Sequence, residues 1–517
     1  MKKNNHLPLF SSYEFDSRFY DEFFTKNEEI RSIYKTLYEI FGSYSVDEFN
    51  RLNSQAKASF FNLGITFQVY GEKEVKEQIF PFDLFPRIIN NKEWETIEKG
   101  VLQRSKALNL FLWDLYHDQK IIKQGIVPED LIKSSVNFLP EMVGLNPPGK
   151  IYNHISGTDL IKHSDGNYYV LEDNIRCPSG VSYVVGNRNA VKHALFGVFN
   201  QYNTHTVVDY GARLLETIES VKPKGVDAPV CVIITPGVYN SAYYEHSFLA
   251  KQMGVVLVEG RDLFVENGFV YMRTIYGPEK VDVIYRRVDD LFIDPLVFNK
   301  DSLLGVPGLF SVYQKGNVTL VNAPGTGVAD DKAVYTYMPE IIKYYLDEEP
   351  ILNNVHTYHC SRKDELKYVL ENIDKLVVKP VDESGGYGIS IGNRLTKEEI
   401  EKVKETVEKL TDNFEIILVA NFIENSNDKT ATIVQEIANK DTVYKPICKP
   451  KEGMMGWDMK EGLAICRGNY LCVIDGDGQF PIENITKCYN EIKKGTYDLV
   501  KTYRIKREDG FYRKSIS

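Results

Sequence analysis

The 517-residue sequence has no long apolar run and little cysteine, and each shortage excludes a class of protein. No stretch approaches the roughly 18 apolar residues that a membrane helix needs, and the lysines of MKKNNHLPLF are followed by no apolar signal segment. The seven cysteines are scattered and include no CxxC pair, so neither a disulfide framework nor a zinc knuckle is predicted. We therefore expect a soluble, cytoplasmic protein.

The chain also lacks the basic excess of nucleic-acid and anionic-lipid binders. Lys and Arg number 62 against 72 Asp and Glu, which gives a net charge of −10. A Walker A loop, GxxxxGK[ST], is absent, and no serine or cysteine lies in a recognisable nucleophile elbow. Small molecules or peptides are therefore the expected substrates.

The length predicts several domains, because one hydrophobic core rarely extends past about 250–300 residues. Apolar residues recur every three or four positions over 93–119, which predicts a helix. Short runs broken by Asp-Gly after residue 150 predict an antiparallel hairpin, and residues 229–258 read as a βαβ unit. DDKAVYTYMPEIIKYYL (330–346) predicts one capped helix.

A glycine cluster between two short strands is the sharpest chemical feature. In VVKPVDESGGYGISIG (377–392), Lys379 ends a strand, and a loop with three glycines precedes the return strand. Such a loop can fold backbone N–H groups over a triphosphate while the ammonium offsets its charge. The alternative is a flexible hairpin with a chance lysine. The loop glycines are Gly385, Gly386 and Gly388.

The predicted hairpin after residue 150 carries oxygen ligands. Alternation places Glu172 and Asn174 on one face of a strand, and Asp159 can lie across from them on the partner strand. Hard oxygen ligands of this kind suit Mg²⁺ that carries phosphates. The alternative is a polar strand face beside a turn. Arg176, which follows, either braces a transferring phosphoryl group or pairs with Asp173.

Other polar side chains each have two readings. Lys332 opens a helix after GTGVADD, as a phosphate contact or as an ordinary exposed lysine. In TPGVYNSAYYEHSFLA, Asn240, Glu245 and His246 either line a substrate site or cap and solubilise a helix. YRRVDDLFIDP adds charges that pair most simply as salt bridges, namely Arg286, Arg287, Asp289 and Asp290.

Near the C-terminal end, an apolar strand runs into two aspartates separated by glycine. In LCVIDGDGQFP (471–481), Asp475 and Asp477 can hold a metal and a nucleotide diphosphate. The alternative is a pair of surface aspartates at a strand end.

Taken together, the strings from about residue 30 to 412 resemble the circularly permuted ATP-grasp family, type two. The acidic strands at 159–174 precede the glycine loop at 383–388, which is the order of the permuted family. The resemblance implies ATP-dependent carboxylate–amine ligation through an acyl phosphate, with ATP and Mg²⁺ as cofactors. It implies ATP contact for Lys332 and Lys379, phosphate cover for Gly385, Gly386 and Gly388, magnesium binding for Asp159, Glu172 and Asn174, and a phosphoryl or acyl-phosphate clamp for Arg176.

From about Phe414 the sequence is instead similar to nucleotide-sugar glycosyltransferases of the dolichyl-phosphate mannosyltransferase type. The strings are FEIILVANFIENSNDKTATIVQEIANKD, GLAICRGNYLCVIDGDGQFPIENI and YDLVKTYRIKREDGFYRKSIS. This resemblance implies that Asp475 and Asp477 bind Mn²⁺ or Mg²⁺ with the sugar diphosphate, and that Asp428 lies near the nucleotide. The base-binding first strand of such enzymes and their acceptor half are not visible, nor is the closing segment of the ATP-grasp region.

The expected fold class is α/β (α+β): circularly permuted ATP-grasp-like lobes with a Rossmann-like segment, plus a partial Rossmann-like nucleotide-sugar transferase domain. The expected function is an ATP-dependent ligase whose magnesium–ATP site is of reduced quality. The alternatives are a metal-dependent glycosyltransferase that binds a nucleotide sugar, and an inactive fusion. The predicted parts are a helical region (1–145), a lobe with the acidic metal strand (146–225), a Rossmann-like substrate segment (226–300), a lobe with the glycine loop (301–412) and a truncated glycosyltransferase-like domain (413–517).

Overall fold

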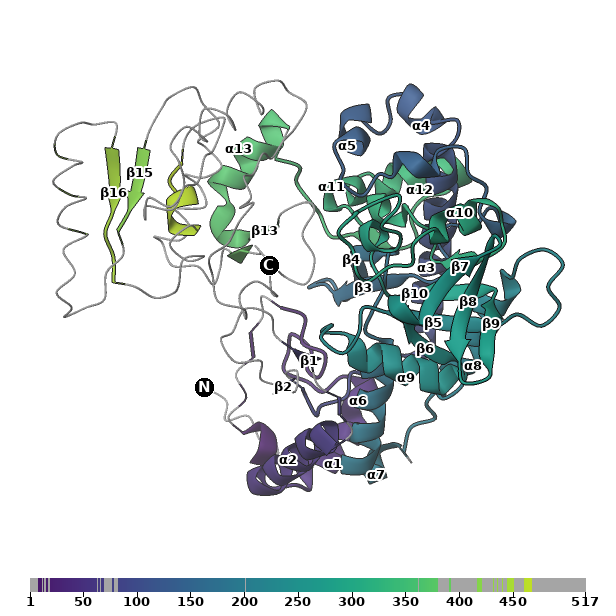
Figure 1. Cartoon of the computed structure of the whole chain (residues 1–517). Helices are drawn as coiled ribbons and strands as arrows, with labels where there is room; N and C mark the ends of the chain where they lie inside the picture. Colours follow the sequence, from purple (N-terminus) through teal and green to yellow (C-terminus); the bar gives the residue numbers. More distant parts are fainter. Residues whose placement is uncertain are drawn as a thin grey trace. The chain divides into compact units, whose positions relative to one another are not determined.

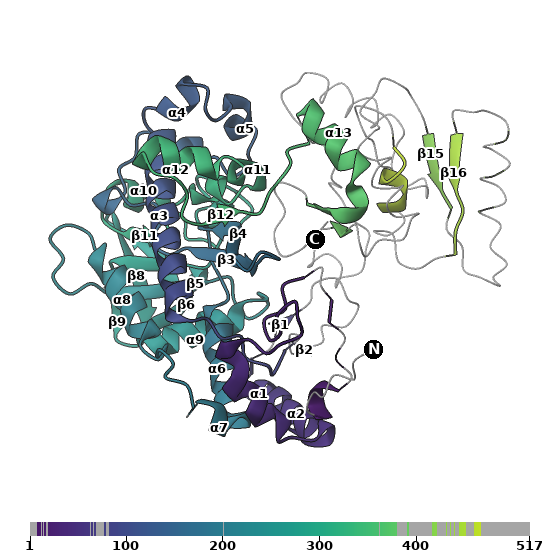
Figure 2. The same ribbon diagram turned by 180° about the vertical axis from the view of Figure 1, so that it is seen from behind.

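The structure is a computed structural model, and Figures 1 and 2 show it from opposite sides. It describes residues 8–379, except 12, 14, 17–18, 63, 66, 69–76, 79–81, 200 and 361, and also 390–391, 416–420, 431, 435, 439, 444–450 and 460–466. The chain forms two compact units, Met1–His359 and Cys360–Ser517, and each is described by itself.

A four-stranded parallel sheet lies at the centre of the first unit, in the order β11-β10-β5-β6. β5 pairs with β6 on one side and with β10 on the other, which confirms the predicted βαβ unit and its parallel strands. Parallel strands need crossover connections, and α9 supplies the one between β5 and β6. The elements are β5 (Cys231–Thr235), α9 (Tyr243–Met253), β6 (Val256–Glu259), β10 (Val283–Arg286) and β11 (Thr319–Val321).

Helices cover both faces of this sheet, which explains why β5 is apolar at nearly every position. Cys231 and Ile233 pack with α8 and α9, whereas Val232 and Ile234 face the core built on α3, α10 and α12. α3 begins with a capping box between Asn90 and its own third residue, Glu93. The helices not yet given are α3 (Asn91–Leu115), α8 (Tyr210–Ser220), α10 (Leu309–Gln314) and α12 (Met338–Leu346).

Smaller sheets accompany the central one, and two of them are described here, one antiparallel and one mixed. The first is the meander β7 (Leu263–Glu266), β8 (Phe269–Thr274) and β9 (Gly277–Val281). The second, here called the acidic sheet, confirms the hairpin predicted after residue 150, and a third short strand joins it in parallel. Its order is β12 (Asn353–Asn354), β4 (Tyr168–Asn174) and β3 (Gly157–Lys162).

An aromatic core joins the N-terminal helices to the helix that follows the acidic sheet. In both views α1 and α2 lie beside α6 and α7. Phe10, Phe24 and Phe41 are buried there with Val191 of α6. The elements are α1 (Lys35–Gly42), α2 (Val46–Asn62), β1 (Phe67–Gln68), β2 (Glu77–Gln78), α6 (Val181–Ala194) and α7 (Phe196–Phe199).

The single helix predicted over 330–346 is wrong, because the segment forms two helices. α11 (Lys332–Tyr335) ends before Tyr337, and α12 starts with Pro339 in its first turn. Proline has no N–H and clashes with the carbonyl four residues earlier, here that of Tyr335, so a continuous helix is excluded. The remaining short elements of the unit are η1 (Pro8–Phe10), η2 (Ser32–Tyr34), α4 (Lys120–Lys123), α5 (Glu129–Lys133), η3 (Pro140–Met142), η4 (Pro148–Lys150), η5 (Gly260–Asp262), η6 (Asp290–Phe292) and η7 (Thr326–Ala329).

The second unit contains the return hairpin of the glycine cluster, since β13 and β14 pair antiparallel as predicted. β15 pairs in parallel with β16, a strand that the sequence reading missed because YKPI contains a proline. The elements are α13 (Lys363–Glu371), η8 (Ile373–Lys375), β13 (Val377–Val378), β14 (Ser390–Ile391), β15 (Ile416–Val419) and β16 (Tyr444–Ile447).

The border between the units, at 359/360, lies inside the predicted lobe 301–412. The finer borders at 145, 225, 300 and 412 stay predictions. Within the described part of the chain, no helix combines the length and the apolar character needed to cross a membrane.

Candidate functional site

The acidic sheet places the three predicted magnesium ligands on one strand pair. Asp159 lies directly opposite Glu172, and Gly157 lies opposite Asn174. The register skips Leu171, and this bulge lets Val170 and Asp173 both be buried while Glu172 and Asn174 share the other face. Asp159 is exposed, and Glu172 and Asn174 are half-buried.

Two carboxylates and one amide on a strand face fit a magnesium ion, which protein sites hold through one or two carboxylates and which keeps water or phosphate as further ligands. In the described residues, no group of three or more His, Cys, Asp or Glu is arranged to hold a metal. The fit therefore depends on the Asn174 amide and on oxygens from outside the protein.

The neighbouring Asp173 has a structural role. Its buried carboxylate accepts hydrogen bonds from Nε of Arg104 at 3.1 Å and from Oγ1 of Thr158 at 3.2 Å. Arg104 also donates to it through Nη2. Arg104 in turn reaches Asn354 of β12 at 2.7 Å. The predicted alternative in which Arg176 pairs with Asp173 is therefore wrong, because Arg104 of α3 pairs with the Asp173 carboxylate instead.

Lys332 lies beside Glu172, and its predicted contact with ATP stays a prediction. Its Nζ is 3.6 Å from Oε2 of Glu172, with both side chains about one quarter exposed or less. Asp331 caps α11, the helix that begins at Lys332, because its carboxylate accepts the N–H of Ala333 at 2.8 Å. The ammonium group of Lys332 and the carboxylate of Glu172 thus lie together near the end of β4.

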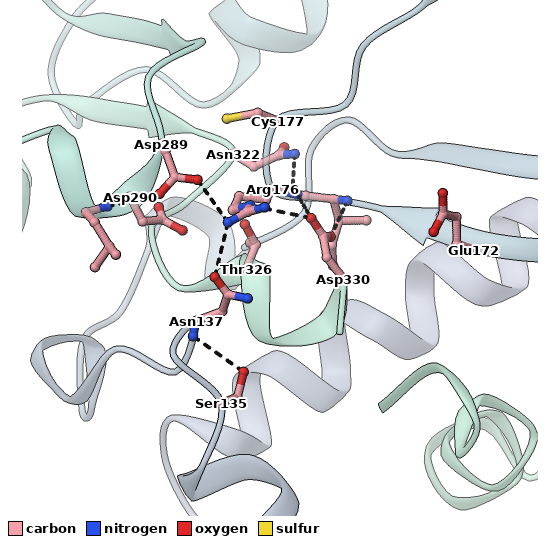
Figure 3. Close-up of polar contacts among 12 residues, drawn as sticks. Ser135, Asn137, Glu172, Arg176, Cys177, Asp289, Asp290, Asn322, Thr326 and Asp330 are labelled. Atoms are coloured by element: carbon pink, nitrogen blue, oxygen red, sulfur yellow. Dashed lines mark hydrogen bonds and ion pairs between the residues drawn. The ribbon is translucent and has the colours of Figure 1, made fainter. Parts of the chain in front are cut away.

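Arg176 follows directly after β4, and its guanidinium lies between three acceptors, as Figure 3 shows. Nη1 is 3.1 Å from Oδ1 of Asn137 and 2.9 Å from Oδ2 of Asp289, and Nε is 3.7 Å from Oδ2 of Asp330. The side chain is 22% exposed. Gly327 makes room for it, since a Cβ there would lie 2.9 Å from Cδ of Arg176.

Asp330 also binds the backbone at the end of β4. One oxygen accepts the N–H of Ile175 at 2.6 Å, and the other accepts the N–H of Arg176 at 3.3 Å. Burial raises the pKa of the Asp330 carboxyl to about 7, and these backbone N–H groups and the Arg176 charge oppose that rise. Asp330 and Asn137 were missed from the sequence; GTGVADDK drew attention only to Lys332, and no signal marks Asn137.

A second, fully buried arginine supports this region from inside. Arg286 donates to the carbonyls of Asn322 and Ala323 at 2.7 and 3.1 Å and pairs with Asp290 at 2.9 Å. The salt-bridge reading of YRRVDD is therefore confirmed for Arg286. Asn322 binds the chain on both sides of the acidic hairpin, since it accepts the N–H of Ile155 and donates to the carbonyl of Ile175.

The structure gives Glu245 and His246 packing roles. Glu245 is fully buried, pairs with Arg287 at 3.3 Å and accepts the N–H groups of Gly180 and Ser182, so it caps α6. His246 Nδ1 lies 2.8 Å from the hydroxyl of Thr235, and burial lowers the pKa of His246 to about 3. Of the reading that these residues cap and solubilise a helix, capping is found for Glu245, whereas the burial of both side chains excludes a solubilising role.

Lys379 is half-buried directly after β13, in the second unit. Its role stays a prediction. The other predicted residues lie outside the described ones, namely Gly385, Gly386, Gly388, Asp428, Asp475 and Asp477.

Several relatives match about three quarters of the chain. An uncharacterized protein of Synechocystis sp. is 49% identical over 389 residues, which cover 75% of this chain and 81% of that protein. An uncharacterized protein of Mycobacterium tuberculosis is 45% identical, covering 75% and 70%. A Frankia alni protein named "Putative glutamate--cysteine ligase 2-3" is 34% identical, but the match covers only 45% of its length.

Among solved structures, a glutathione synthetase-like effector from Globodera pallida aligns over 70% of this chain and 79% of its own, with a TM-score of 0.41 and 13% identity. Residues 393–517 match the family described as glycosyl transferase family 2. Residues 86–425 match the family described as circularly permuted ATP-grasp type 2. The chain therefore belongs to the circularly permuted ATP-grasp type 2 family, and a glycosyl transferase family 2 region is fused to its C-terminal side.

Proposed function

We propose that the chain is an ATP-dependent carboxylate–amine ligase. The observation that carries the proposal is the face of the acidic sheet, where Asp159 lies opposite Glu172 and Lys332 lies 3.6 Å from the same glutamate. Family membership supports the same reading. Phosphoryl transfer needs positioning and charge neutralisation rather than a covalent protein group. Carboxylates that hold a divalent cation and a lysine that contacts phosphate supply both.

The reaction has two steps. A substrate carboxylate oxygen attacks the γ-phosphorus of ATP, the bond from that phosphorus to the bridging oxygen breaks, and ADP leaves. The amine nitrogen then attacks the acyl carbon, the carbon–oxygen bond to phosphate breaks, and the amine loses a proton. Bound Mg²⁺ would offset charge on the transferring phosphoryl oxygens.

Each residue has a proposed part in this scheme. Asp159, Glu172 and Asn174 would hold the cation, and Lys332 would contact phosphate once Glu172 turns to the metal. Arg176 would orient the phosphoryl or acyl-phosphate oxygens. Lys379 and the loop glycines belong to the scheme through the family resemblance alone: Gly385, Gly386 and Gly388.

Calorimetric titration of the full chain with Mg–ATP tests nucleotide binding. We expect Glu172→Gln and Lys379→Ala each to weaken binding about tenfold or more, since a hydrogen bond to a charged group contributes about 1.5–3 kcal/mol. The matched controls are Glu98→Gln and Lys375→Ala, which change exposed residues in the same two units. Absence of binding at millimolar Mg–ATP, or equal binding by all variants, would exclude the proposal.

Trapping of the acyl phosphate tests the chemistry. Hydroxylamine attacks an acyl phosphate to give a hydroxamate, so a panel of amino-acid carboxylates with ATP identifies the acid. Glutamate is the first acid to test, because a relative is named for glutamate–cysteine ligation. A hydroxamate that forms with one acid and disappears in Glu172→Gln is the expected result.

A second function is proposed for the fused region, because residues 393–517 match glycosyl transferase family 2. It predicts manganese-dependent binding of a nucleotide sugar that is lost in Asp477→Ala. Titration of a set of nucleotide sugars with and without Mn²⁺ measures this binding. Binding that does not depend on the metal or on Asp477 removes the glycosyltransferase reading, and inactivity of both regions leaves an inactive fusion.

A further inference from the structure

Three consecutive residues, Asp330 to Lys332, contact the acidic sheet and the helix beside it in three different ways. Asp330 accepts the N–H groups of Ile175 and Arg176. Asp331 caps α11 through the N–H of Ala333, and Lys332 reaches Glu172. Side chains of this segment therefore contact two kinds of group near the end of β4, the backbone N–H groups of Ile175 and Arg176 and the carboxylate of Glu172.

Asp330 occupies the place of a missing strand partner. β4 ends at Asn174, so Ile175 and Arg176 have no partner in the sheet ladder for their N–H groups. One carboxylate receives both of them, and its side chain is only 16% exposed. Buried backbone N–H groups need such acceptors, because leaving one unpaired costs about 1–3 kcal/mol.

This anchor restricts where Lys332 can lie. Two residues of extended chain span at most about 7 Å, so a fixed Asp330 keeps the backbone of Lys332 close to the end of β4. The same carboxylate lies 3.7 Å from Nε of Arg176, whose other acceptors are Asp289 and Asn137. Asp330 thus contacts Arg176 and also limits where the backbone of Lys332 can lie.

We propose that Asp330 is the positioning residue of the ligase site: it orients Arg176 and holds Lys332 within reach of Glu172. The proposal rests on the proposed function, because Lys332, Glu172 and Arg176 belong to that site. Asp330 is not among the residues proposed to bind metal or nucleotide. It acts through Arg176 and Lys332, which are.

Two substitutions separate its contacts. Asp330→Ala removes every acceptor, so both the backbone anchor and the Arg176 contact are lost. Asp330→Asn keeps one carbonyl oxygen for the N–H of Ile175, but its amide N–H₂ opposes the guanidinium. We therefore expect Asn to restore the position of Lys332 but not the contact with Arg176, which would keep only Asp289 and Asn137 as acceptors.

Lysine acetylation followed by mass spectrometry reads the position of Lys332 without any nucleotide. Labelling of Lys332, relative to the exposed Lys315, is expected to rise in full-length Asp330→Ala and to return toward the wild-type level in Asp330→Asn. Asp301→Asn changes an exposed aspartate and serves as the control. Thermal unfolding of each variant shows whether it is folded.

Mg–ATP titration of the same proteins gives the second readout. Asp330→Ala is expected to bind about tenfold more weakly than the wild type, and Asp330→Asn to lie between them. Folded Asp330→Ala with unchanged labelling and unchanged affinity would overturn the inference, as would equal effects of Ala and Asn. If the wild type binds no Mg–ATP, the proposed function fails, and the labelling of Lys332 then shows separately whether Asp330 positions this lysine.

Discussion

Two histidines, the buried His246 and the half-buried His154, are kept neutral by the packing around them. Burial lowers the pKa of His246 to about 3 and that of His154 to about 4. Each therefore binds a proton less readily in the folded chain than in the unfolded chain, where the ordinary pKa is about 6.5. Their stabilising effect is present above pH 6.5 and is lost as the pH falls toward 3–4.

We predict that His246→Gln makes stability less dependent on pH. The free energy of unfolding of the wild type should fall by up to about 1.4 kcal/mol per pH unit and per buried histidine below pH 6.5. The variant should be less stable at pH 7.5, since the contact with Thr235 changes, but should lose less between pH 6.5 and 5.5. Urea unfolding at these pH values measures the difference. The exposed His205→Gln is the control, and parallel curves for His246→Gln and the wild type would contradict the prediction.

At the scale of elements, one buried ion pair fastens α3 to the acidic sheet. Arg104 and Asp173 are 1% and 5% exposed in their side chains, and Asn354 joins them from β12. Removing one member of a buried pair leaves an uncompensated charge, which costs about 3–5 kcal/mol. The contact therefore fixes the strand that carries Glu172 and Asn174.

We predict that Arg104→Met lowers the free energy of unfolding by about 3–5 kcal/mol. Lys106→Met alters an exposed residue of the same helix and should change it by less than about 0.5 kcal/mol. The double variant Arg104→Met, Asp173→Asn should recover part of the loss, because no unpaired charge remains buried. Urea unfolding of the three proteins is the measurement, and a double variant less stable than Arg104→Met would argue against this account.

Close packing between α3 and β12 depends on a glycine in the middle of the helix. A Cβ at Gly100 would lie 2.4 Å from Cγ of Leu352, a buried residue directly before β12. We predict that Gly100→Ala destabilises by about 1–3 kcal/mol from overpacking, although alanine favours a helix by about 1 kcal/mol. Gly197→Ala, in α7, has open space and should be neutral or stabilising. Thermal unfolding compares the two, and equal melting temperatures would exclude overpacking.

Local patterns predicted the elements better than the contacts between them. The hairpin of β3 and β4 and the βαβ unit follow from apolar periodicity and from turn residues close in sequence. The acceptors around Arg176 could not be predicted from local patterns. Asp330, for example, binds Ile175, which lies 155 residues away in the sequence. Where sequence reading failed locally, as for the helix over 330–346, Pro339 carried a signal that was overlooked.

At the scale of the whole molecule, the residues predicted to take part in ligation are divided between the two compact units. The predicted metal ligands, Lys332 and Arg176 belong to Met1–His359, whereas Lys379 and the loop glycines belong to Cys360–Ser517. The family match over 86–425 crosses the border between the units. The part of the chain that matches the family is therefore incomplete without residues of the second unit.

We predict that a fragment of residues 1–359 folds but does not bind Mg–ATP. Each of the five hydrophobic clusters in the described part of the chain is built from residues of this unit, so its core does not depend on the other. A single cooperative unfolding transition, followed by circular dichroism in urea, is the expected sign of folding. Calorimetry of the fragment should then show no binding. This effect exceeds the weakening of about tenfold expected for Lys379→Ala, because Lys379 and the loop glycines are all missing. Full affinity in the fragment would mean that Lys379 takes no part in the site and that the acidic sheet with Lys332 binds the nucleotide alone.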